Sequence, residues 1–211
     1  FGAMSATGQM ARRTKIEPLV PGLFHVDPPY CYRCPLHLSY PSCGTACVEE
    51  FDEVIRREGP ETVAAIVVEP VIGGGGVIPS PDGYLQRLRE ICDEHQVLLI
   101  FDEVITGWGR TGKLFGCEHE GVTPDIMVMA KGITSGYQPL GATIVTDEVF
   151  EAFAGETADR REFAQVCTYG GHPAACAAAL ANIEILTSEK LWENAAKVGA
   201  KLLAGLRGLS S

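Results

Sequence analysis

Val97-Leu98-Leu99-Ile100-Phe101-Asp102 and Ile126-Met127-Val128-Met129-Ala130-Lys131 are two short apolar runs that each end in an ionisable residue. Runs of this length are typical of strands that are buried on both faces of a parallel sheet. A third run, residues 64–68, ends in the same way at Glu69. The pattern predicts an α/β fold that brings Asp102, Lys131 and Glu69 to the strand ends, where open α/β sheets bind ligands.

Lys131 and Asp102 offer two complementary chemical groups at that edge. Apolar surroundings favour the neutral amine of a lysine, which is a nucleophile and can form a Schiff base. A carboxylate that faces it across a ligand keeps a pyridine nitrogen protonated, so that the ring can accept electrons. The two residues together indicate pyridoxal 5′-phosphate as the cofactor.

Each residue on its own has a simpler structural explanation. An aspartate at a strand end commonly caps a turn, and an isolated lysine is commonly solvated. Lys113 is the nearest alternative to Lys131, but it follows a glycine-rich loop and no apolar run. We therefore take Lys131 as the candidate catalytic lysine.

The sequence around these residues resembles that of the class III aminotransferases, which are pyridoxal-phosphate enzymes of fold type I. The resemblance is carried by residues 102–112 (DEVITGWGRTG), by Ala130-Lys131-Gly132, by residues 69–79 (EPVIGGGGVIP) and by residues 168–173 (TYGGHP). It implies a large domain with a mixed, mostly parallel sheet flanked by helices. It also implies that Lys131 carries the cofactor as a Schiff base and moves the substrate proton.

The same resemblance implies roles for three further residues. Val104, two positions after Asp102 and so on the same side of an extended chain, would pack against a face of the cofactor ring. Thr168 matches a position that binds the phosphate of the neighbouring subunit's cofactor, which implies a homodimer. Glu69 matches the glutamate of the family's Glu-Pro turn and would position the cofactor-binding residues without touching the cofactor. A structural role in a buried turn explains Glu69 equally well.

One departure from the family pattern bears on the substrate. Members that use 2-oxoglutarate often have a glutamate near the position of Gly74, and this glutamate pairs with an arginine from the C-terminal domain. Glycine has no carboxylate and cannot form this pair. The resemblance is thus closer to transaminases that pass an amino group from a primary amine or ω-amino acid to a 2-oxo acid, pyruvate in particular. Racemases, decarboxylases and aminomutases on the same scaffold remain alternatives.

Four cysteines present an alternative of another class. Cys31-x2-Cys34 and Cys43-x3-Cys47 lie within seventeen residues, a spacing that tetrahedral zinc accepts. The stretch between the two pairs lacks clear knuckle glycines. Similar stretches occur in this aminotransferase subfamily without an expected metal. We assign no metal here, and keep a noncatalytic metal-binding or dimerisation fragment as the alternative.

The composition limits the partners. A net charge of −10 disfavours nonspecific nucleic-acid binding and an anionic membrane surface. No apolar stretch approaches the roughly 20 residues of a membrane span, and residues 1–4 lack the features of a signal peptide, so we expect a cytoplasmic protein. The resemblance begins in mid-domain, which favours a fragment without the family's upstream phosphate-binding turn or its C-terminal small domain.

The organisation expected along the chain is one unit, the central part of the cofactor-binding domain at residues 1–211. Residues 1–48 read as an irregular segment rich in Cys and Pro, and residues 49–211 as the α/β core. Helices are expected at Glu49–Arg57, from Pro81 through Cys92, at Pro173–Leu186 and at Glu189–Leu206. The run Leu140–Thr146 follows Lys131 too closely for a helical crossover, so it should pair antiparallel.

Overall fold

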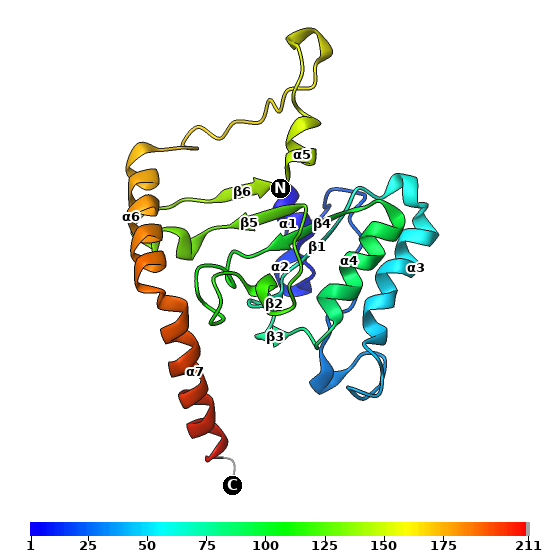
Figure 1. The fold of residues 1–211 in the computed structure, drawn as a ribbon. Coiled ribbons are helices and arrows are strands. Elements are labelled where there is room, and N and C mark those ends of the chain that lie inside the picture. Colours follow the sequence, from blue (N-terminus) through cyan, green and yellow to red (C-terminus); the bar gives the residue numbers. More distant parts are fainter. Residues whose placement is uncertain (210–211) are drawn as a thin grey trace.

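The main sheet has four strands in the order β1-β4-β5-β6 (Figure 1). A computed structural model describes residues 1–209, without the side chain at position 157. The strands are β1 (Ala65–Val68), β4 (Leu98–Asp102), β5 (Ile126–Met129) and β6 (Ala142–Val145). β1, β4 and β5 are parallel, whereas β6 runs antiparallel to β5. The mostly parallel mixed sheet and the antiparallel last strand are both confirmed.

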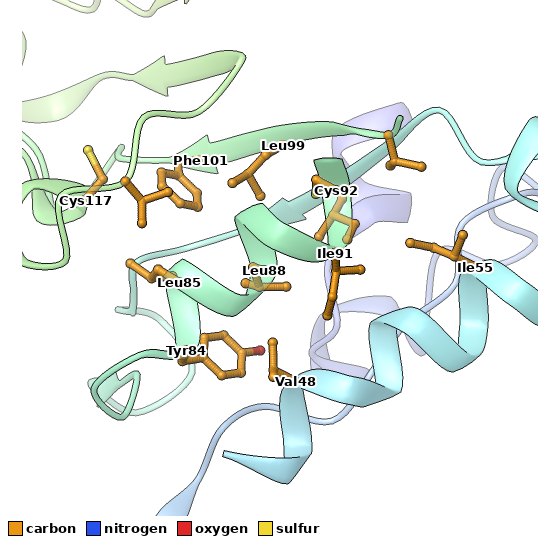
Figure 2. Packing of buried hydrophobic residues seen from close by; sticks show 13 residues of the cluster. Val48, Ile55, Tyr84, Leu85, Leu88, Ile91, Cys92, Leu99, Phe101 and Cys117 are labelled. Carbon is orange, nitrogen blue, oxygen red and sulfur yellow. The ribbon is translucent and has the colours of Figure 1, made fainter. Parts of the chain in front are cut away.

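Helices α3 (Glu49–Glu58) and α4 (Tyr84–His95) pack beside the sheet and form the main core with it (Figure 2). The apolar side of α4 is buried as its spacing predicts, at Tyr84, Leu85, Leu88, Ile91 and Cys92. It meets Leu99 and Phe101 of β4, which are both fully buried. This core fixes the position of β4, and therefore the position of the strand end that carries Asp102.

The start of α4 differs from the prediction. Pro81 precedes the helix instead of beginning it, and the helix begins at Tyr84 after Gly83. Gly83 has a φ of +84°, a left-handed conformation that glycine adopts without a steric cost. The chain therefore makes a glycine turn between Pro81 and the first helical residue, which the proline rule alone did not reveal.

The prediction that the strands are buried on both faces is wrong for this chain. In β4 the burial alternates, since Leu99 is buried while Leu98 is exposed. In β1, Val67 remains 54% exposed. The helices α3 and α4 cover one face of these strands, and no described helix covers Val67 on the other.

At the other end of the sheet, α6 (Pro173–Glu189) and α7 (Leu191–Arg207) form one long arm that is bent at Lys190 (Figure 1). Both helices were expected, and their bounds differ from the prediction by up to three residues. The segment between α5 (Asp147–Glu151) and α6 runs outside the sheet, and its described side chains from residue 152 to residue 172 are all exposed.

The first 48 residues are mostly irregular, as expected, but contain two short helices that were not predicted. These are α1 (Gly2–Ala6) and α2 (Met10–Arg13). The remaining elements are a small ladder of β2 (Val71–Ile72) with β3 (Ile78–Pro79) and the 3₁₀ turns η1 (Cys31–Arg33), η2 (Ala46–Val48), η3 (Pro60–Thr62), η4 (Gly116–His119), η5 (Lys131–Thr134) and η6 (Thr157–Asp159). Within residues 1–209, no helix is both long enough and apolar enough to cross a bilayer.

Candidate active site

The ends of the parallel strands bring Glu69 and Asp102 to the same edge of the sheet. Val68 of β1 is paired with Phe101 of β4, and Glu69 and Asp102 directly follow these two residues. Because neighbouring parallel strands end at the same edge, the two carboxylates lie side by side there. The juxtaposition expected from the sequence is therefore present.

Asp102 is half-buried and has one oxygen engaged. Its Oδ1 accepts a hydrogen bond of 2.9 Å from the backbone N–H of Val104. Its Oδ2 accepts no hydrogen bond from any residue within the described range 1–209. One oxygen of Asp102 is thus held by the turn, and the other is available to a ligand.

The extended-chain argument for Val104 is wrong, because the strand ends at Asp102 and the chain turns at once. The hydrogen bond to Asp102 nevertheless keeps Val104 beside the carboxylate, and its side chain is half-buried. A contact of Val104 with a cofactor ring remains a prediction.

Lys131 follows β5, the strand next to β4. Asp102 is paired with Val128, so Lys131 lies three residues beyond the partner of Asp102. Its φ of +43° lies in the left-handed region, which costs a residue with a side chain about 1–3 kcal/mol. Backbone strain of this kind concentrates at functional sites, where the surrounding structure holds it in place.

The electrostatics of Glu69 tie these residues together. Burial raises the pKa of Glu69, and a 2.9 Å hydrogen bond from the backbone N–H of Gly73 lowers it. The charge of Asp102 raises the same pKa, whereas the charges of Lys131 and Arg12 lower it. The charges of Asp102, Lys131 and Arg12, which come from three separate segments of the chain, thus all act on this one carboxylate.

The turn that carries Lys131 is packed from two sides. A Cβ on Gly132 would lie only 2.8 Å from Cβ of Trp108. The close approach of the loop after β4, which carries Trp108, therefore requires glycine at position 132. Trp108 in turn meets the ring of Phe115 edge-on, with 5.4 Å between the ring centres. On the other side, Asn182 of α6 donates hydrogen bonds to the carbonyl oxygens of Gly132 and Ile133.

A hollow of about 440 Å³ opens beside Lys131. It is lined by Lys131, Thr134, Gly136, Gln138, Pro139 and Leu140. Its volume lies within the range of about 300–1,000 Å³ that is common for small-molecule sites. Lys131 itself is exposed, so the apolar surroundings that its strand predicts are wrong for this chain. The physical reason is that β5 ends at Met129, and the turn carries Lys131 beyond the buried part of the sheet.

Thr168 is not brought to this cluster by any contact among the described residues. It is exposed, in a turn just before α6, and the hydrogen bonds of that turn are local ones between Cys167 and Gly170 and between Tyr169 and His172. A role for Thr168 at the site of another subunit remains a prediction. Lys113, the alternative lysine, is exposed on its loop.

Glu103 is a residue that the sequence reading did not single out. Its carboxylate is fully buried and accepts backbone hydrogen bonds of 2.9 Å from Gly116 and 2.8 Å from Cys117, together with one from the hydroxyl of Thr106. It therefore ties the beginning of the loop after β4 to its far end at Gly116 and Cys117, with Trp108 between them. Its only signal in the sequence is its place next to Asp102, within the motif of residues 102–112.

The four cysteines of the alternative reading line one small cavity of about 20 Å³. The neighbouring thiols contribute to raising the pKa of Cys31 and of Cys47, after burial, which is the larger cause. Among the residues of the described range, however, no three of these sulfur atoms lie within 4.8 Å of one another. The spacing that suggests zinc thus brings the four thiols to one cavity, and whether they hold a metal remains a question for experiment.

The residues at the strand ends fit pyridoxal phosphate by their chemistry. The free Oδ2 of Asp102 can accept the N–H of a pyridine ring, and the amine of Lys131 makes no hydrogen bond or ion pair with the described part of the chain. Pyridoxal phosphate bound there would meet a carboxylate and a free amine, which are the two groups that its ring nitrogen and its aldehyde require.

Comparison with known proteins agrees with this chemistry. The family model for class-III aminotransferases matches residues 1–211. The chain is 43% identical over 213 residues to the taurine–pyruvate aminotransferase of Bilophila wadsworthia (strain 3_1_6), a match that covers 99% of this chain and 46% of the relative. The chain thus spans about half the length of the curated relatives that it matches.

Two solved structures are similar over nearly the whole chain. One is a thermostable (S)-enantioselective ω-transaminase from Thermomicrobium roseum, with 48% identity, a TM-score of 0.90, and coverage of 99% of this chain and 46% of that one. The other is an amine transaminase from an uncultivated Pseudomonas species in its PLP-bound form, with 44% identity, a TM-score of 0.94, and coverage of 99% and 47%. The fold that the resemblance implied is confirmed.

Proposed function

Because the chain belongs to the class-III aminotransferase family, we propose that it forms the lysine-bearing part of a transaminase that uses pyridoxal phosphate. The observation that carries the proposal is the meeting of Asp102, Lys131 and Glu69 at the ends of three adjacent strands. The reaction that we propose moves an amino group from a primary amine or ω-amino acid to a 2-oxo acid.

The residues divide the chemistry between them. Lys131 would hold the cofactor through its Nζ, and Asp102 would hold a proton on the pyridine nitrogen. When bound, pyridoxal phosphate withdraws electrons from the amine-bearing carbon of the substrate. The amine of Lys131 would take the proton from that carbon, a role that suits an exposed, unpaired amine at the edge of a hollow.

Glu69 would support the other two residues without contacting the reacting atoms. Its carboxylate is anchored by the backbone N–H of Gly73 and lies within electrostatic reach of both Asp102 and Lys131. Glu69 would thus help to hold the glycine turn and the strand ends in place around the two reacting residues.

We also propose a homodimer in which Thr168 of one subunit contributes to the phosphate site of the other. The exposed position of Thr168 and of the segment that leads to it supports this, since no hydrogen bond or ion pair of the described structure joins residues 158–172 to their own Lys131 site. Pyruvate is the proposed amino acceptor. The glycine at position 74 supports this choice, as does the name of the Bilophila relative, which pairs an aminosulfonate with pyruvate.

The test begins with the covalent step. Pyridoxal phosphate is added to the purified protein, to Lys131→Ala and to Lys113→Ala, and borohydride then fixes any imine to its lysine. Peptide mass mapping should find the modification on Lys131 in the parent protein and in Lys113→Ala, and should lose it in Lys131→Ala. Equal labelling of the three proteins would contradict the assignment of the lysine.

The reaction type is tested in the enzyme at full family length. Formation of alanine from pyruvate in the presence of a primary amine, abolished in Lys131→Ala, is the expected result. Racemisation of an amino acid, or release of CO₂ from it, without any alanine from pyruvate would replace transamination by one of the other reactions of the scaffold. Asp102→Asn should leave the labelling of Lys131 possible but slow alanine formation by at least about a hundredfold, because proton control at the ring is lost.

A further inference from the structure

Four cysteines lie on two short hooks of the irregular N-terminal segment. Cys31 begins the 3₁₀ turn η1, and Cys34 directly follows its end. Cys43 and Cys47 flank a second turn, in which the backbone N–H of Ala46 donates a hydrogen bond of 3.2 Å to the carbonyl oxygen of Cys43. Each hook therefore presents a pair of thiols on one tight turn of the backbone.

The second hook has an unusual backbone. Gly44 and Thr45 have φ values of +57° and +59°, which both lie in the left-handed region. Glycine adopts this conformation freely, but a β-branched residue such as threonine adopts it only where the surrounding structure requires it. The sequence shows no clear knuckle glycines between the two cysteine pairs, whereas the structure makes its sharp bend inside the second pair. The bend turns the chain so that Cys43 and Cys47 line the same cavity.

All four thiols line this one cavity, and its other walls are neutral. The described residues that complete its lining are prolines, leucines, tyrosines, a threonine and an alanine, with no acidic or basic side chain among them. Burial is the main cause of the raised pKa of Cys47, and the charges of the other three thiols raise that pKa further. Within this lining, no protein cation stands ready to neutralise a thiolate. A bound metal centre would supply the positive charge that four thiolates need.

The spacing of the sulfur atoms distinguishes between two kinds of metal centre. Thiolates on a single tetrahedral ion lie about 3.8 Å apart, given a metal–sulfur distance of about 2.3 Å. Within residues 1–209, no three of the four sulfur atoms lie within 4.8 Å of one another. An iron–sulfur cluster distributes its four thiolates over several iron atoms, which inorganic sulfide joins, so that the thiolates lie farther apart. Four separated thiols around one apolar cavity therefore fit a cluster better than a single ion.

The two hooks differ in how firmly they are attached to the fold. Cys47 packs against the main core, and Val48, the next residue, is fully buried in it. Cys31 is exposed and Cys34 is half-buried, so the first hook forms the outer wall of the cavity. The cavity of about 20 Å³ is larger than the roughly 10–15 Å³ that one water molecule needs. The outer hook can move outward to admit a larger group without disturbing the core.

We propose that the two hooks bind an iron–sulfur cluster, whose ligands are the Sγ atoms of Cys31, Cys34, Cys43 and Cys47. Each thiol would release its proton as its sulfur bonds to iron, and the free energy of binding would be added to the stability of the fold. The cluster would clamp the outer hook to the chain that leads into α3, which begins at Glu49. This role is structural and is independent of the proposed transaminase function.

The first experiment measures the composition of the site. The protein is purified without oxygen and without pyridoxal phosphate, whose absorption would overlap, and is reconstituted with ferrous iron and sulfide. Iron and acid-labile sulfide should be bound in equal amounts, with a broad visible absorption that dithionite bleaches. The paired substitution of Cys31→Ser with Cys43→Ser, which removes one ligand from each hook, should abolish the sulfide and the absorption. Cys167→Ser makes the same chemical change at an exposed position and should keep both.

Three results of this experiment would overturn the proposal. The first is iron without an equal amount of sulfide, which indicates an adventitious ion only. The second is a single zinc ion in place of iron. The third is equal retention of iron and sulfide in the paired variant and in the parent protein. None of these measurements requires turnover of an amine, so they test the cluster even if the transaminase function is wrong.

The second experiment tests the clamp in the unsubstituted protein. Arg33 is exposed and lies between Cys31 and Cys34, where trypsin can cut the outer hook. Cleavage after Arg33 should be slower by about tenfold or more in the cluster-loaded protein than in the iron-free protein, because the bound hook opens less often. Cleavage after the exposed Lys113, on the loop after β4, should be unchanged and serves as the internal control. Equal cleavage after Arg33 in both forms would rule out the clamp.

Discussion

The side-chain amide of Asn182 donates a hydrogen bond of 2.9 Å to the carbonyl oxygen of Gly132. The same amide donates to Ile133 at 3.1 Å, and the hydroxyl of Ser135 donates to the amide oxygen. One side chain of α6 thus satisfies the backbone of the turn that carries Lys131, from a position fifty residues further along the chain. The orientation of the lysine depends on a helix that is remote from it in sequence.

Removal of this amide should loosen the lysine turn. Asn182→Ala leaves two carbonyl groups and one hydroxyl without their partner, which we expect to cost about 1–3 kcal/mol of unfolding free energy. Cofactor loading, measured as borohydride-fixed label on Lys131, should fall in parallel. Asn194→Ala makes the same chemical change at an exposed position of α7 and should affect neither quantity in urea unfolding or in labelling.

The buried carboxylate of Glu103 should be difficult to replace, even by its amide. In Glu103→Gln one acceptor oxygen becomes an N–H₂ group that faces the backbone N–H of Gly116 or of Cys117. A buried donor without an acceptor costs about 1–3 kcal/mol, so the loss of stability should be of that size. Glu53→Gln, at an exposed position, serves as the control. An unchanged midpoint of chemical unfolding in Glu103→Gln would show that its hydrogen bonds contribute little.

Glu69 should make stability depend on pH. Burial raises its pKa in the folded protein above the ordinary value of 4.5, so folding disfavours the ionised form. The penalty is absent while the carboxyl is protonated in both states, and it develops as the pH rises from 4.5 through the raised pKa. Glu69→Gln should therefore raise the melting temperature of the cofactor-free protein at pH 7 and lose this advantage towards pH 4.

The matched variant for that experiment is Glu61→Gln, which removes an exposed carboxylate before the same strand. Its melting temperature should follow that of the parent protein at every pH. A gain in Glu69→Gln that was equally large at pH 4 and at pH 7 would indicate an effect of packing instead of ionisation.

The four-cysteine cavity should contain no tightly held zinc. Thiolates on a tetrahedral zinc ion lie about 3.8 Å apart, given a Zn–S distance of about 2.3 Å. Within the described residues no three of these sulfur atoms lie within 4.8 Å of one another. Elemental analysis after purification should find far less than one zinc per chain, and a chelator should leave the melting temperature unchanged. One equivalent of zinc that is lost in Cys31→Ser would contradict this expectation.

Most of the sheet could be predicted because each strand is a short apolar run that ends at an ionisable or turn residue. The register of Val68 with Phe101 and of Asp102 with Val128 then follows from packing of parallel neighbours, and it is this register that assembles the site. The antiparallel course of β6 also followed from the sequence, since the connection from Lys131 is too short for a helix.

Contacts between distant segments were beyond the reach of sequence patterns. The approach of Arg12 to Gly74 and of Asn182 to Gly132 depends on three-dimensional packing that no local period reports. The exposure of Lys131 was missed for a related reason, because an apolar strand predicts burial only as far as its last residue. The cysteine spacing correctly indicated that the four thiols lie close together, since all four line one cavity.

The contacts of the loop after β4 with the lysine turn and with α7 have a practical consequence for fluorescence measurements. The chain has two tryptophans, and both lie at this contact: Trp108 against Gly132, and Trp192 of α7 with its Cβ 3.4 Å from the position that a Cβ on Gly109 would take. The intrinsic fluorescence of the protein therefore originates within one small region next to the lysine. Changes in emission intensity or polarity should report cofactor entry and loop movement directly, without an added dye.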